Sequence, residues 1–105
     1  MRFTSFLDNG MLTVVLTGEI DHHCAKTYID AITAKIEVYL PHECVLDFEQ
    51  VTFMDSSGIA VVINALRNMT KINGILRVAG MGEQPLKVFR ASGMDKIVEI
   101  KEVYS

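Results

Sequence analysis

The residues Asp55-Ser56-Ser57-Gly58 place a carboxylate and two hydroxyl groups directly before a stretch with helical periodicity. Ser56 or Ser57 could cap the helix by accepting from a free backbone amide, while the carboxylate of Asp55 complements the helix dipole. A helix start needs only one such cap, so the second serine can face an incoming group. Gly58 carries no side chain that would obstruct the approach to it.

Phosphorylation is the most economical chemistry for a serine in this position. A phosphate adds about −1.5 to −2 charge and three acceptor oxygens. The free amides at a helix N-terminus can hold part of it, while the carboxylates of Asp55 and Asp21 would repel it. A neutral, hydroxyl-lined surface would become strongly anionic, and a partner docked there would lose complementarity through repulsion and desolvation.

Catalytic and metal-binding chemistry fit the same region less well. A serine hydrolase needs a base beside its nucleophile, but the candidates His22 and His23 lie in a different loop and no GxSxG elbow surrounds the serine. His22, His23 and Cys24 are consecutive, so on a helix they point about 100° apart and do not converge on one ion. The sequence contains no glycine-rich phosphate loop that would support nucleotide binding. We therefore expect a non-enzymatic chain without metal or cofactor.

The elements that position these residues follow from hydrophobic periodicity. Asn9-Gly10 predicts a hairpin turn, Pro41 ends the first helix, and VTFMD forms a loop before the serines. The pattern predicts strands over 2–7, 11–17, 43–48, 75–79 and 96–100, and helices over 21–40, 57–72 and 84–92. This order predicts one α/β domain over residues 1–105, with a mixed, mostly parallel sheet and an antiparallel N-terminal hairpin.

Such a sheet gathers its strand-to-helix loops at one edge, beyond the carboxyl ends of the strands. The expected loops are Gly18–Asp21, Phe48–Ser56 and Gly80–Glu83. Asp21 and the Asp55-Ser56-Ser57 cluster therefore share a surface. The helix that follows is apolar nearly all round over residues 59–63, so either part of it is exposed for docking or flanking loops cover it.

Composition narrows the range of partners. The chain has 105 residues, a formal net charge of −3 and a pI of about 5.5, which favours neither nucleic acid nor an anionic membrane surface. Cys24 and Cys44 have no CxxC spacing and are expected to be reduced and packed. The N-terminal segment fits neither a signal peptide nor a membrane-spanning helix. We expect a cytoplasmic protein whose partners are proteins or small molecules.

Two motifs resemble those of a known family. The segments "FMDSSG" at 53–58 and "LTGEIDHHCA" at 16–25 are similar to the bacterial anti-sigma factor antagonists of the stage II sporulation type, which are single STAS domains. The resemblance implies a mixed sheet with helices mainly on one face. It also implies partner switching: the unmodified antagonist binds an anti-sigma factor that is a serine kinase, phosphorylation releases it, and a metal-dependent phosphatase restores it.

The resemblance assigns roles residue by residue. Ser56, directly after the aspartate, corresponds to the phosphoacceptor, with Ser57 as its neighbour and possible cap. The expected partner-binding residues are Asp21, His22, His23, Asp55, Ser56, Ser57, Gly58 and Ile59. The chain ends soon after the last strand, where many relatives continue into a helix. The alternative function is a STAS interaction module in another assembly, such as a stressosome-like complex or a transporter-associated one.

Overall fold

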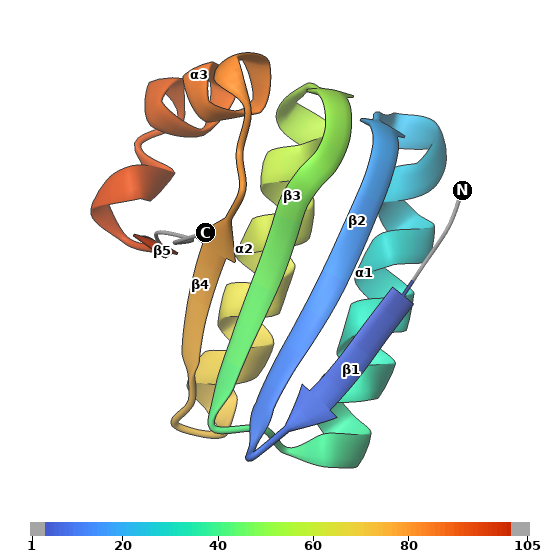
Figure 1. Ribbon diagram of the computed structural model, residues 1–105, viewed down its shortest axis with the longest axis vertical. Helices are drawn as coiled ribbons and strands as arrows, with labels where there is room; N and C mark the ends of the chain where they lie inside the picture. Colours follow the sequence, from blue (N-terminus) through green and yellow to red (C-terminus); the bar gives the residue numbers. More distant parts are fainter. Residues whose placement is uncertain (1–3, 102–105) are drawn as a thin grey trace.

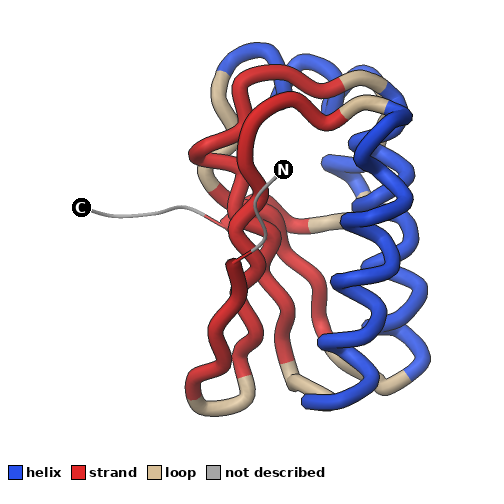
Figure 2. Tube along the Cα trace, turned by 90° about the vertical axis from the view of Figure 1, so that its right-hand side faces the viewer, coloured by secondary structure: helices blue, strands red, loops and turns tan. Residues whose placement is uncertain are grey.

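Helices α1 and α2 lie side by side along one face of a five-stranded sheet (Figures 1 and 2). The computed structural model describes residues 4–101. Its strands are β1 (Thr4–Asp8), β2 (Met11–Ile20), β3 (Glu43–Met54), β4 (Ile75–Ala79) and β5 (Glu99–Lys101). Its helices are α1 (His22–Tyr39), α2 (Ser56–Lys71) and α3 (Glu83–Ala91), followed by a 3-10 turn at Met94–Lys96.

The sheet order is β1-β2-β3-β4-β5, antiparallel between β1 and β2 and parallel elsewhere. This confirms the predicted α/β fold with its mixed sheet and N-terminal hairpin. The turn at Asn9-Gly10 has positive φ at both residues, 51° and 80°, as a tight hairpin between twisted strands requires.

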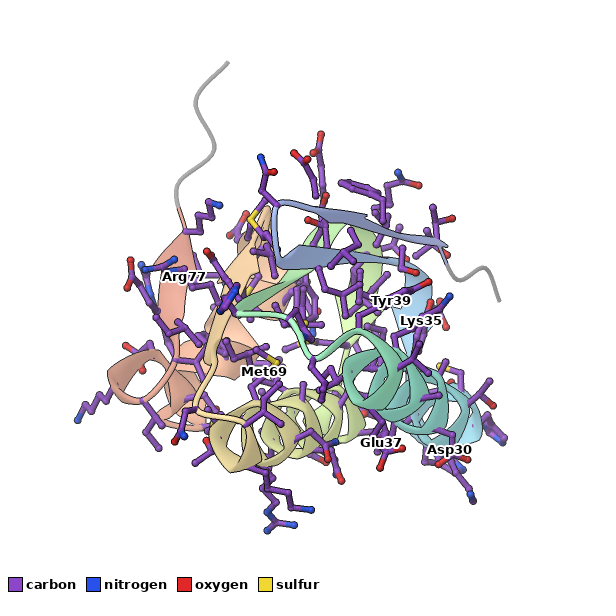
Figure 3. The ribbon with its side chains drawn as sticks, turned by 90° about the horizontal axis from the view of Figure 1, so that it is seen from below. Asp30, Lys35, Glu37, Tyr39, Met69 and Arg77 are labelled. Carbon is purple, nitrogen blue, oxygen red and sulfur yellow. The ribbon has the colours of Figure 1, made fainter. Side chains whose placement is uncertain are left out.

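The core lies between the sheet and the two long helices. Alternate residues of the central strands are fully buried on the helix side: Leu12, Val14, Leu16, Cys44, Leu46 and Phe48. Seen from below, Met69 points from α2 toward the sheet, whereas Asp30 and Glu37 lie on the solvent side of α1 (Figure 3). Tyr28 links α1 to β2, because its hydroxyl group accepts from Thr17 N and donates to Thr17 O, each at 3.1 Å.

Several predicted boundaries were wrong. VTFMD is not a loop, because β3 continues to Met54 and β2 to Ile20. The pairing shifts register between Val15 and Thr17 and again between Gly18 and Glu19. These shifts break the period-two pattern from which a strand is recognised in a sequence.

The two terminal strands also differ from the prediction. The first predicted strand is found as β1, and its residues 2 and 3 lie outside the described residues. The last strand starts later than expected, because Lys96 belongs to the 3-10 turn and Val98 N donates to Met94 O at 2.8 Å. That amide is used in the turn, so the β4–β5 pairing in the described part of the chain begins only at Glu99.

Candidate functional site

The carboxyl ends of β2 and β3 bring the predicted site residues to one edge of the sheet (Figure 1). Ile20 pairs with Met54 at the ends of the two strands, and Asp55 N donates to Ile20 O at 3.3 Å. Asp21 is the single residue between β2 and α1, and Asp55 is the single residue between β3 and α2. Strand pairing therefore sets the two helix starts beside each other, although they are far apart in the sequence.

Both helices are capped by these aspartates. Asp55 Oδ1 accepts from Ser57 N at 2.8 Å, and Asp21 Oδ1 accepts from His23 N at 2.9 Å. The expectation that Ser56 or Ser57 supplies the cap was therefore wrong. Aspartate has a short acceptor that reaches the amide two residues later, and it satisfies the same free donor as a serine would. Neither serine of the cluster is needed to start α2.

Exposure grades along the first turn of α2. Ser56 is exposed at the first helical position, and Ser57 is half-buried. Gly58 and Ile59 are buried, the latter with only 8% of its surface exposed. Ser56, directly after the capping carboxylate, is thus the more exposed of the two serines.

Gly58 has a different role from the one expected. A Cβ added there would lie 2.9 Å from Met54 Cβ and 2.8 Å from Met54 Sδ. The missing side chain therefore lets α2 approach the end of β3, and it does not clear a path to the serines. Gly58 supports the site from beneath.

We predict that Gly58→Ala destabilises the fold by about 1 to 3 kcal/mol. Replacing glycine by alanine inside a helix normally stabilises it by about 0.5 to 1 kcal/mol. A loss of stability in Gly58→Ala would therefore reveal the clash with Met54. Urea unfolding measures it, with Gly82→Ala as the control: a Cβ at Gly82 meets nothing within 4 Å and its φ is −74°, so this variant should lose only the preference for glycine over alanine at the N-cap of α3, about 1 kcal/mol or less. Equal stability of Gly58→Ala and the unmodified chain would contradict the packing role.

The next turns of α2 are mostly covered. Val61 is 1% exposed, and Ala60 and Ile63 are half-buried. The sequence left open exposure for docking or coverage by flanking loops; the segment is mostly covered, and helix α1, which packs alongside α2, provides much of that cover. The edge therefore presents polar helix starts to solvent more than an apolar helix face.

The first turn of α1 adds two histidines to the edge. His22 and His23 are exposed, with ring centroids 4.0 Å apart, and His23 Nδ1 lies 3.6 Å from Asp21 Oδ1. The hydrogen bond from the His23 amide, helped by the nearby imidazole, lowers the pKa of Asp21 below 3.8. The Asp21 carboxyl thus stays ionised to a lower pH than an ordinary aspartate does. Cys24 is half-buried and its Sγ lies 3.2 Å from Glu19 O.

One residue of this edge was missed in the sequence. Gln84, near the start of α3, accepts through Oε1 from Met54 N and donates through Nε2 to Met54 O, both at 2.9 Å. The third strand-to-helix loop was expected at this edge, but Gln84 lies just past its predicted end. Only the fold shows that its side chain reaches back to β3.

Within residues 4–101, no group of three or more His, Cys, Asp or Glu side chains is arranged to hold a metal ion. No helix in the same range combines the length and apolar character needed to cross a membrane. The same edge of the sheet carries the exposed Ser56, the carboxylates of Asp21 and Asp55, and the imidazoles of His22 and His23.

The family model of the STAS domain matches residues 7–105. The chain belongs to the STAS domain family. This STAS domain is 28% identical over 99 residues to the anti-sigma-B factor antagonist of Listeria monocytogenes, covering 91% of this chain and 83% of that protein. It is 29% identical over 91 residues to the anti-sigma F factor antagonist of Paenibacillus polymyxa, covering 87% and 78%.

Solved structures share the fold of this STAS domain. The unphosphorylated form of the anti-sigma factor antagonist SpoIIAA superposes with a TM-score of 0.85 at 24% identity, covering 99% of this chain and 90% of that one. The phosphorylated form of the Bacillus cell fate determinant SpoIIAA gives a TM-score of 0.76 at 24% identity, covering 99% and 93%. The sheet and the helices of this STAS domain therefore follow an arrangement known from antagonist structures.

Proposed function

We propose that this STAS domain is an anti-sigma factor antagonist controlled by phosphorylation of Ser56. In the unphosphorylated form it binds an anti-sigma factor with serine kinase activity and frees the sigma factor; the phosphorylated form is released. The observation that carries the proposal is the exposed Ser56 hydroxyl at the start of α2, where Asp55 already provides the cap. Two relatives named as antagonists of anti-sigma factors support it, as does the existence of a solved phosphorylated form of the antagonist SpoIIAA, which shares the fold.

Electrostatics explain how one phosphate could end the binding. The helix keeps its cap, because Asp55 and not Ser56 accepts from the Ser57 amide, so modification leaves the start of α2 intact. The free amides at the α2 N-terminus hold part of the added charge. Together with the carboxylates of Asp21 and Asp55, the phosphate makes the edge strongly anionic, and a partner that fits the neutral surface is repelled.

The docking surface consists of the two helix starts. The exposed His22 and His23 contact the partner together with Ser56, and Asp21, Asp55 and Ser57 contribute hydrogen-bonding groups. Gly58 and Ile59 hold this surface in place from below. The partner is a protein and neither nucleic acid nor membrane. A metal-dependent serine phosphatase removes the phosphate from Ser56 and restores binding. Both reactions take place in the cytoplasm. The domain itself contributes no catalysis and needs no cofactor.

The proposal is tested by phosphorylation with the kinase that co-purifies with the chain from its native cell. We predict that incubation with this kinase and ATP adds one phosphate, located on Ser56 by mass spectrometry of the peptides. Ser56→Ala should accept none, whereas the matched Ser57→Ala should be modified as the unmodified chain is. A phosphate on Ser57, or co-purification of a transporter in place of a kinase, would count against the proposal.

A further inference from the structure

Among residues 4–101, no strand pairs with the end of β3 on the side of β4. β4 pairs with β3 from Glu43 to Asp47 and ends at Ala79, so β3 continues to Met54 without it. Met54 is fully buried, and a buried backbone N–H or C=O group without a strand partner needs another hydrogen-bonding partner. Gln84 supplies it: a side-chain amide carries one acceptor and a donor group, as a peptide group does, and its two 2.9 Å bonds to Met54 replace those of a missing strand.

Met54 is also held by its other contacts. Its side chain is fully buried, and Gly58 of α2 packs so closely on it that an added Cβ would lie within 3 Å of Met54 Cβ. On the opposite edge, Met54 pairs with Ile20 of β2. Strand, helix and Gln84 thus fix this residue from three directions. Ser56 lies two positions later, with only the capping Asp55 between them.

We propose that Gln84 is a positioning residue for phosphate transfer to Ser56. The role rests on the proposed function of Ser56. In the transfer, Ser56 Oγ forms a bond to the γ-phosphorus of ATP, the bond to the β,γ-bridging oxygen breaks, ADP leaves, and the hydroxyl proton passes to the kinase or to solvent. Such a reaction depends on the attacking oxygen being held in line, and a displacement of about 1 Å can lower its rate about 100-fold.

The role of Gln84 in this step differs from that of a residue that contacts the kinase. Its amide uses one acceptor site and one N–H to bind the backbone of Met54, and the residue is half-buried, so we infer that it acts on the serine through the backbone of β3 and not by touching the kinase. Losing it should therefore affect the turnover number of the phosphorylation more than the Michaelis constant. A loss of general stability alone would not produce this difference in the folded protein.

The test compares Gln84→Met with Gln50→Met. Methionine keeps the length of the side chain and removes both hydrogen bonds; Gln50 lies exposed on β3 and makes no side-chain hydrogen bond among residues 4–101. With the co-purified kinase and ATP, we expect kcat for Ser56 to fall about tenfold or more in Gln84→Met, with KM changed less. Amide hydrogen exchange of Met54 should become faster in the same variant. Gln50→Met should behave as the unmodified chain in both measurements.

A second variant keeps the proposal testable if Gln84→Met folds poorly. In Gln84→Glu the ionised carboxylate still accepts from Met54 N but cannot donate to Met54 O, whereas the protonated acid can do both. Near neutral pH the donor to Met54 O is therefore missing, and kcat for Ser56 should fall in Gln84→Glu as it does in Gln84→Met, with KM changed less. An unchanged kcat in folded Gln84→Glu would overturn the positioning role.

The outcomes separate this proposal from the proposed function. Phosphorylation of the unmodified chain on Ser56 together with an unchanged kcat in Gln84→Met would overturn the positioning role alone, even if Met54 exchanged faster. Absence of phosphate on Ser56 in the unmodified chain would overturn the proposed function, and the role of Gln84 in the transfer with it.

Discussion

Ser56→Asp is expected to weaken binding to the anti-sigma factor kinase by about 100-fold, because it places a permanent charge where the partner fits a hydroxyl. Ser56 is exposed and follows Asp55, whose carboxylate caps α2, so a second carboxylate at this edge adds to an existing negative charge. The cap itself is unaffected. Isothermal titration calorimetry of the purified pair measures the effect directly.

The matched control is Ser56→Asn, which has nearly the shape of aspartate without its charge. It should retain most of the affinity, and the difference between the two variants should shrink as salt screens the charge. Equal losses for Asn and Asp would mean that the partner rejects bulk at position 56. Unimpaired binding of Ser56→Asp would contradict the switch.

Phe89→Ala is expected to destabilise the domain by about 3 to 5 kcal/mol, a large part of the total stability of a domain of this size. Phe89 is fully buried and belongs to α3, a helix of nine residues that is too short to persist without tertiary contacts. Removing the ring takes away the largest buried side chain of α3. The free energy of unfolding in urea measures the effect.

Phe6→Ala is the matched control, because the same ring is deleted where 55% of the residue is exposed. It should cost about 1 kcal/mol or less. Since α3 carries Gln84, Phe89→Ala should also accelerate exchange of the Met54 amide beyond its effect on global unfolding. A loss of under 1 kcal/mol for Phe89→Ala would show that α3 is held by other contacts.

The sequence alone sufficed for the order of the elements and for the edge of the sheet at which the candidate site residues lie. Regular alternation in β2, the Asn9-Gly10 turn and two amphipathic helices are local signals that survive folding, because each reflects which side of an element is buried. The segment around Ser56 was also recognisable, since a carboxylate and hydroxyls before an apolar stripe are typical of a helix start.

Only the tertiary structure decided which residue caps α2 and what Gly58 does. Aspartate and serine are equally good caps, so the choice depends on where β3 ends, and that end is set by pairing with Ile20 and by the bonds from Gln84. Position 58 needs a residue without a side chain, because the Met54 side chain packs directly against it. Both facts arise from contacts between segments distant in the chain, which a local pattern does not encode.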